Sequence, residues 1–305
     1  MTTISAKMVS ELREKTGAGM MKCKEALSVC QGNFEEAIDY LRKKGMASAD
    51  SKSSRTTSQG LVVTAVSQDG SCAAMLELNC ETDFVARTDD FKHFSRDLVE
   101  CVLNNPDVSN VPNLETMRLP SNHTVEEERK ALISKIGENV TINRFELFKI
   151  PLGKYGVFDT YIHGDGNLGV VTLAECTSAR GAIHDDLRQF AHDVSLQVAA
   201  MKPKCINRGD ISSEVLNREK EILRGQLKED PKNANKPEEI LRKIIDGRLD
   251  KFFIESCLMD QAFIKDDTKN IATVADELEQ KLGGRVSVSL FRRWVVGEKA
   301  SPTSA

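Results

Sequence analysis

The chain has 305 residues, enough for about two domains, and 40% of them are hydrophobic, so it can bury a sizeable core. Charged residues make up 29% and nearly balance at a net charge of −4, without the basic excess typical of proteins that mainly bind nucleic acid. No apolar run approaches the ~20 residues that span a bilayer, and charged residues interrupt the N-terminal segment where a signal peptide would be apolar. We therefore expect a protein that stays in the cytoplasm, or in an organelle after processing of a longer precursor, and that contacts neither membrane nor nucleic acid directly.

Eight cysteines are spread through the chain, and they form no CxxC pair and have no histidine cluster beside them. Zinc centres and thioredoxin-type sites depend on such spacings, so the sequence predicts neither. We expect reduced thiols that are buried as small hydrophobic groups. No metal and no cofactor is expected.

The first 46 residues predict three short helices. Apolar residues recur at helical spacing in residues 5–15 and 20–30. A third helix is predicted to begin after Asn33, with Glu36 completing a capping box, and to end at Gly45.

Two methionines, Met20 and Met21, directly follow a glycine-rich turn between the first two helices. One explanation is that both fill the small core. We expect one of them to lie in the core and the other to be available for a partner, because methionine adapts well to binding surfaces.

The segment after the third helix changes character twice. Residues 47–59 are small and polar and predict a flexible linker. Alternating apolar residues then predict strands, interspersed with helices. The strands are expected at 61–67, 72–79, 140–150, 157–163, 168–175 and 285–296, and the helices at 90–103, 124–136, 185–201 and 271–282.

Two further charged helices are predicted at 213–229 and 237–256. Each carries a narrow apolar seam, and a short polar turn separates them. This pattern favours an antiparallel helical hairpin over two separate surface helices.

An internal repeat relates residues 66–102 to residues 162–198, without gaps, at an offset of 96. Each copy predicts a strand, an Asp-Gly turn, a second strand, a loop and a helix. We infer two related α+β subdomains that pack together. Identical pairs are Asp69/Asp165, Gly70/Gly166, Cys80/Cys176, Ala86/Ala182, Asp89/Asp185, Asp90/Asp186, Phe94/Phe190, Asp97/Asp193 and Val102/Val198.

The two copies differ in the loop before the helix. The first carries Glu81-Thr82-Asp83-Phe84-Val85 and the second carries Thr177-Ser178-Ala179-Arg180-Gly181, so the repeated fold does not require an Asp-Phe pair there. One explanation is that Asp83 caps the following turn and Phe84 folds inward. The alternative is an acidic residue beside an exposed aromatic side chain at a loop tip, as in interface anchors.

Several short motifs, in order along residues 3–298, resemble the elongation factor Ts family. Each motif alone is weak, but the ordered set is specific. The motifs are Leu12-Arg13-Glu14-Lys15-Thr16-Gly17-Ala18-Gly19-Met20-Met21 with Cys23-Lys24-Glu25-Ala26-Leu27, Asn79-Cys80-Glu81-Thr82-Asp83-Phe84-Val85-Ala86, Glu126-Glu127-Glu128-Arg129, Lys135-Ile136-Gly137-Glu138-Asn139, Tyr161-Ile162-His163-Gly164 and Gly247-Arg248-Leu249.

The resemblance implies an α+β fold with a small three-helix N-terminal domain like a ubiquitin-associated domain, a two-subdomain core and an inserted coiled-coil hairpin. Together with the patterns above, it gives the three-helix domain at 1–46, the linker at 47–59, core subdomains at 60–139 and 140–298, the insertion at about 213–256, and a disordered tail at 299–305. Family members bind elongation factor Tu, a GTPase, and speed release of its GDP. The resemblance therefore implies a one-to-one heterodimer with that GTPase, or a dimer of it, and no enzymatic activity.

The resemblance also assigns a binding loop. Thr82, Asp83, Phe84 and Val85 would contact the GTPase and displace its Mg²⁺. Phe84 would wedge near two helices of the GTPase domain, and so disturb the site where Mg²⁺ and the phosphate-binding loop hold the nucleotide.

Further partner contacts implied by the resemblance involve Met20, Met21 and His163. From the residues alone, His163 is equally well explained as a loop histidine with local partners. Lys22 departs from the family, which commonly has aspartate after the methionine pair. The segment after Glu298 is too short and polar for the C-terminal helix of some members, so we expect that contact to be missing.

Two other function classes explain less of the sequence. A ubiquitin-binding adaptor would account for the three-helix domain but leaves the repeat unexplained. An enzyme is disfavoured because the chain has no P-loop, GxSxG, HExxH or dinucleotide fingerprint. Asp89-Asp90 and Asp185-Asp186 stand at predicted helix starts in both copies, where the helix dipole explains them.

Overall fold

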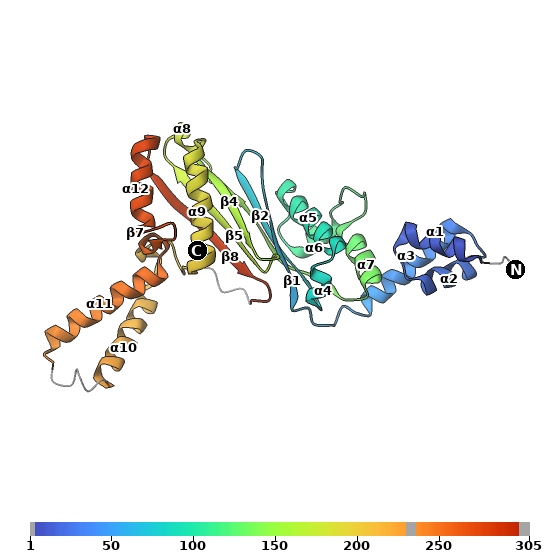
Figure 1. Ribbon diagram of the computed structural model, residues 1–305, viewed down its shortest axis with the longest axis horizontal. Helices are drawn as coiled ribbons and strands as arrows, with labels where there is room; N and C mark the ends of the chain where they lie inside the picture. Colours follow the sequence, from blue (N-terminus) through green and yellow to red (C-terminus); the bar gives the residue numbers. More distant parts are fainter. Residues whose placement is uncertain (1–3, 230–235, 299–305) are drawn as a thin grey trace.

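The computed structural model describes residues 4–229 and 236–298; the predicted tail at 299–305 lies outside the described residues. Three helices, α1 (Ala6–Thr16), α2 (Met20–Val29) and α3 (Phe34–Asp50), pack together at one end of the molecule (Figure 1). Two three-stranded antiparallel sheets follow, and the mixed α+β class is confirmed. A pair of long helices projects from the second sheet at the opposite end (Figure 1).

The predicted end of the third helix at Gly45 is wrong. Helix α3 continues through Gly45 to Asp50, so the beginning of the predicted linker is helical. A Cβ atom on Gly45 would lie 2.8 Å from the Ser134 hydroxyl oxygen. The glycine therefore allows close approach of α3 to a core helix and does not stop the helix.

Each sheet has a central strand that is buried along nearly its whole length. In the first sheet, β2 (Cys72–Cys80) lies between β1 (Gln59–Val66) and β3 (Val140–Lys149). In the second, β5 (Leu168–Cys176) lies between β4 (Gly156–His163) and β8 (Val286–Val295). The predicted subdomain boundary at residue 140 would separate β3 from the sheet that it completes, because β3 pairs with β2.

Alternation along the central strands assigns their side chains to two layers. On β2, Ala74, Leu76 and Leu78 join the hydrophobic cluster under the helices of the first copy. Ala73 and Met75 point the other way and join a cluster with residues of the second sheet. The two sheets therefore face each other, with helices on their outer sides.

The helices on the outer side of the first sheet are α4 (Asp83–Ala86), α5 (Asp89–Asn104), α6 (Val111–Thr116) and α7 (Val125–Ile136). On the second sheet they are α8 (Ala179–Ala182), α9 (Asp185–Met201) and α12 (Ile271–Leu282). The acidic pairs at residues 89–90 and 185–186 lie in the first turns of α5 and α9, as expected for charges that stabilise a helix N-terminus.

The internal repeat is visible as an approximate twofold relation between the sheets. The amide of Val62 on β1 donates to the carbonyl of Gly166 at 2.8 Å, and the equivalent amide of Phe158 on β4 donates to the carbonyl of Gly70 at 2.9 Å. The β-bulges are also equivalent, between Glu77 and Leu78 in β2 and 96 residues later in β5. The relation extends to β3 and β8, which occupy the same place in each sheet.

The long helices α10 (Ser213–Glu229) and α11 (Glu238–Ser256) form an antiparallel hairpin on the second sheet. The chain enters and leaves the hairpin at one place, where the amide of Lys204, before α10, donates to the carbonyl of Ser256, at the end of α11, at 2.8 Å. Val215, Ile222 and Ile240 are exposed and lie outside the contact between the two helices. Leu216, Leu223, Leu227, Ile244, Ile245, Leu249 and Phe253 make it.

Smaller elements connect the hairpin to the core. They are the 3₁₀ turns η1 (Arg208–Asp210) and η3 (Leu258–Asp260) and the two-stranded sheet of β6 (Ala262–Phe263) and β7 (Asp266–Asn270). Within the described ranges, no helix is long and apolar enough to cross a membrane.

The close approach of the two sheets gives a stability prediction. A Cβ atom on Gly169 of β5 would lie 2.4 Å from Cγ1 of the fully buried Val62. We expect Gly169→Ala to lower the free energy of unfolding by about 1–3 kcal/mol through overpacking. Urea unfolding followed by circular dichroism measures it. Gly209→Ala is the control, because nothing lies within 4 Å of its added methyl group, and equal midpoints for the two variants would contradict the prediction.

Candidate functional site

The loop that differs between the two copies ends in the short helix α4. Thr82 caps this helix, since its hydroxyl oxygen accepts from the amide of Val85 at 3.4 Å. The turn directs neighbouring side chains apart: Phe84 is 80% exposed, whereas Val85 is 6% exposed and packs in the core of the first copy. Asp83 is exposed and forms an ion pair with Arg87 at 3.3 Å. The structure thus presents Asp83 and Phe84 to solvent.

A segment after α7 holds the base of this loop. The Glu138 carboxylate accepts from the Thr82 amide at 3.0 Å and from the Thr82 hydroxyl at 2.8 Å. The Asn139 amide donates to the Glu81 carboxylate at 2.7 Å. The buried side-chain amide of Asn139 donates to the carbonyls of Ser53 and Arg55, so the segment before β1 is attached to the same place.

The Cys80 thiol supports the loop from beneath. Its Sγ donates to the Thr82 carbonyl at 3.1 Å. Burial raises the pKa of the Cys80 thiol to about 12, and the Glu138 carboxylate adds to the rise. The thiol therefore stays protonated near neutral pH and acts as a donor, not as a nucleophile.

His163 lies at the same end of the sheets as the α4 loop. It ends β4, and in the turn that follows it the Gly166 carbonyl accepts from the Val62 amide, near the start of β1. Gln59, the first residue of β1, pairs with Cys80, two residues before Thr82. The His163 ring is exposed and its Nδ1 lies 2.9 Å from the Tyr161 hydroxyl. Its partner in the chain is therefore local, and its outer face remains accessible.

Both methionines of the glycine turn are exposed, Met20 at 54% and Met21 at 76%. The expectation that one of them lies in the core is therefore wrong. Cys23, Ala26 and Leu27 fill that core instead, whereas the two methionines stand at the start of α2, beyond the part of the helix that packs in the core. The structure does not place the methionines beside α4.

Lys22 turns toward the core of the molecule. Its Nζ donates to the Ser134 carbonyl on α7 at 3.4 Å. With lysine here, α2 has no acidic residue in its first turn, and its N-cap residue, Gly19, has no side chain to cap the helix. The Lys22 side chain thus makes a contact between the N-terminal helices and α7.

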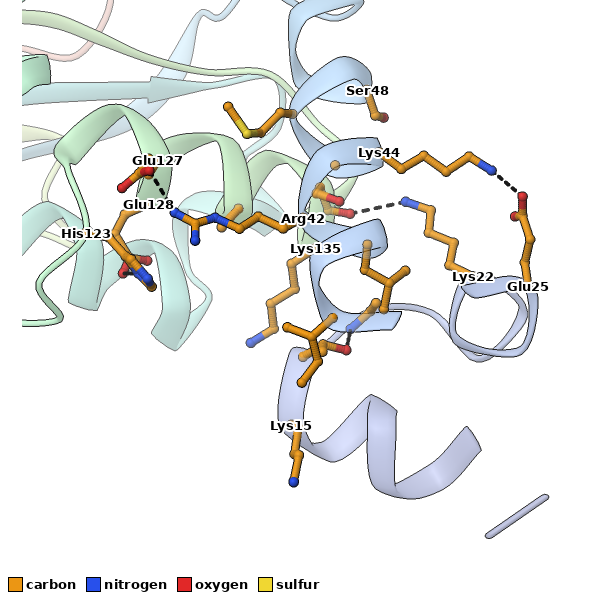
Figure 2. A pocket seen from close by; sticks show the side chains of 18 residues that line it. Lys15, Lys22, Glu25, Arg42, Lys44, Ser48, His123, Glu127, Glu128 and Lys135 are labelled. Atoms are coloured by element: carbon orange, nitrogen blue, oxygen red, sulfur yellow. Dashed lines mark hydrogen bonds and ion pairs between the residues drawn. The ribbon is translucent and has the colours of Figure 1, made fainter. Parts of the chain in front are cut away.

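Helix α3 packs on α7 through ion pairs, and a cleft lies between the two helices (Figure 2). Arg42 pairs with Glu127 at 2.7 Å, and Lys130 pairs with Asp50 at 2.8 Å. The cleft between the helices has a volume of about 510 Å³ and mixes apolar and charged walls. Ion pairs between partly exposed side chains contribute about 0–1 kcal/mol each, so these two pairs stabilise the contact between α3 and α7 only modestly.

The site is suited to contact and not to bond making. The α4 loop presents an exposed phenyl ring and a carboxylate, and an exposed histidine lies at the same end of the sheets. The two exposed methionines stand apart from them, on the N-terminal helices. Sequence analysis missed Glu138 and Asn139. Both lie in the Lys135–Asn139 motif, but their partners are 56 and 58 residues away in the chain, and no local pattern predicts such a contact.

Comparison with known proteins identifies relatives over nearly the whole chain. A family model described as elongation factor TS matches residues 81–298. Elongation factor Ts of Clostridium perfringens (strain 13 / Type A) is 40% identical over 295 residues, which cover 97% of this chain and 93% of the relative. Elongation factor Ts of Nostoc sp. (strain PCC 7120) is 41% identical over 302 residues, covering 98% and 94%. That of a Nitratiruptor species is 41% identical over 297 residues, covering 97% and 93%.

The exposure of Phe84 gives a second stability prediction. We expect Phe84→Ala to change the free energy of unfolding by less than about 0.5 kcal/mol, because an exposed ring makes few contacts within the chain. Phe94→Ala is the matched comparison, since that ring is 6% exposed in the core of the first copy and its loss costs about 3–5 kcal/mol. Thermal unfolding of both variants tests this, and a large loss in Phe84→Ala would mean that the ring packs inward.

Proposed function

Because the chain belongs to the elongation factor Ts family, we propose that it binds elongation factor Tu with GDP and promotes GDP release by disturbing the Mg²⁺ and phosphate site. As a member of this family it is a nucleotide-exchange factor of translation elongation and not an enzyme. Exchange takes place where translation takes place, in the cytoplasm.

Thermodynamics sets the requirement that such a factor must meet. It shifts the GTPase toward the nucleotide-free state only if it binds that state more tightly than the GDP state. The part of the interface that enforces this difference must occupy space that the nucleotide-bound partner does not offer. A rigid side chain projecting from a fixed support serves this purpose better than a flexible loop, because less ordering entropy is lost on binding.

The observation that carries the proposal is the exposure of Phe84 on a braced turn. The ring is 80% exposed although it follows a strand whose residues are nearly all buried. Asp83 precedes it, and its carboxylate adds charge where a basic or amide group of the partner can pair with it. We place Phe84 between helices of the GTPase, where it displaces the elements that hold Mg²⁺.

The other exposed groups fit a wider footprint on the same partner. Met20 and Met21 offer an adaptable apolar contact from the N-terminal helices, and His163 offers a polar contact at the same end of the sheets as the α4 loop. Val85 supports the loop from the core and Thr82 caps it, so these two act through the position of Phe84. A one-to-one complex uses each of these surfaces once.

A release assay tests the proposal. Fluorescently labelled GDP is bound to the cognate elongation factor Tu, and its release is followed with wild-type chain and with Phe84→Ala. We expect wild type to accelerate release and Phe84→Ala to lose about 30-fold in rate, as for an interface anchor worth about 2 kcal/mol.

Ile183→Ala is the matched control for this assay. Ile183 is 74% exposed and follows the equivalent short helix α8 in the second copy, so it loses comparable exposed apolar area. Its rate should equal that of wild type. Equal losses in both variants would show that the effect of Phe84 is not specific to the α4 loop, and no acceleration by wild type would reject the exchange function.

A further inference from the structure

The second copy of the repeat shows which contacts the loop needs for folding. Ser178, equivalent to Thr82, caps α8 by accepting from the Gly181 amide at 3.3 Å. The Arg285 amide donates to the Thr177 hydroxyl at 2.8 Å, just as the Asn139 amide donates to Glu81 in the first copy. Both copies therefore share the cap and the link to their third strand.

One contact is absent from this shared set. Gly284 stands at the position equivalent to Glu138, and a Cβ atom there would lie 2.7 Å from the Ser178 Cβ. The second copy makes the same cap and short helix with no carboxylate at that place and no room for a side chain. The two hydrogen bonds from Thr82 to Glu138 are thus an addition to the fold in the copy that carries Phe84.

We propose that Glu138 is a positioning residue for nucleotide exchange, which holds Thr82 so that Phe84 projects as a rigid wedge. This inference rests on the proposed function of the loop. Glu138 touches neither Phe84 nor, in the proposed complex, the nucleotide. It acts through the N-terminal turn of α4, only two residues before the ring.

The geometry explains why a carboxylate is suited to this role. Hydrogen bonds to a charged acceptor are about twice as strong as neutral ones, and two of them to one residue fix its orientation as well as its position. Gly137, in the left-handed conformation at φ 90°, ends α7 and turns the chain so that Glu138 reaches Thr82. Since α7 packs in the core, Glu138 anchors the α4 loop to a rigid helix.

A double-mutant cycle tests the inference with the release assay described above. We expect Glu138→Ala to lower the maximal release rate at saturating factor about tenfold, with less than a twofold change in the concentration that gives half the maximal rate. Glu138→Gln should fall between this variant and wild type, because the amide keeps one acceptor oxygen but not the second. In the Phe84→Ala background, Glu138→Ala should have less than a twofold further effect, since a positioning residue has nothing left to position.

Two controls separate the possible failures. Ser178→Ala removes the equivalent cap in the second copy and should leave release unchanged, and unfolding midpoints should show that Glu138→Ala remains folded. If wild type and Phe84→Ala behave as the proposed function requires but Glu138→Ala keeps the wild-type rate, the positioning role is wrong. Independent losses that multiply in the double variant would also overturn it. If wild type itself does not accelerate release, the proposed function fails first.

Discussion

Two reciprocal hydrogen bonds join the sheets, from Val62 to Gly166 and from Phe158 to Gly70. They accompany the face-to-face packing of the two sheets, on which the rest of the molecule depends. A three-stranded sheet with helices on one side still has an apolar side to cover. Here each sheet covers the other, through a cluster that includes Met75, Val171 and Trp294. The arrangement also fixes the surface, since it brings the turn after His163 to the end of the first sheet from which α4 projects.

The approximate symmetry separates what the fold requires from what one copy adds. Both copies have the bulge, the short helix and its cap, and the acidic first turn of the following helix. The exposed phenyl ring and the carboxylate that braces its loop occur in the first copy, where the second has Arg180 and Gly284. A contact that stabilised the turn in general would be useful twice, so its single use favours a role in binding.

Much of this could be predicted from the sequence, because the relevant signals are local. Period-two alternation and turn residues place the strands, and the offset of 96 predicts the shared architecture of the two halves. The comparison of the copies also directs attention to Phe84, whose exposure the structure bears out. The prediction fails where a residue's role is set by a distant partner. Gly45 resembles a helix stop until Ser134 is placed beside it, and β3 is assigned to the wrong half because its pairing with β2 is non-local.

The internal symmetry has a consequence for how the sheets are held together. Contacts that map onto each other by a twofold relation are those of a self-complementary dimer, in which each half would leave its inner face bare when alone. If the two halves were separate chains, the fraction associated would depend on their concentrations. Within a single chain, the covalent link gives each half a fixed and high effective concentration of the other, so the closed form survives dilution. The fusion also lets the sequences of the two halves diverge. The α4 loop of the first copy can then specialise in binding, while the equivalent loop of the second copy keeps only its structural role.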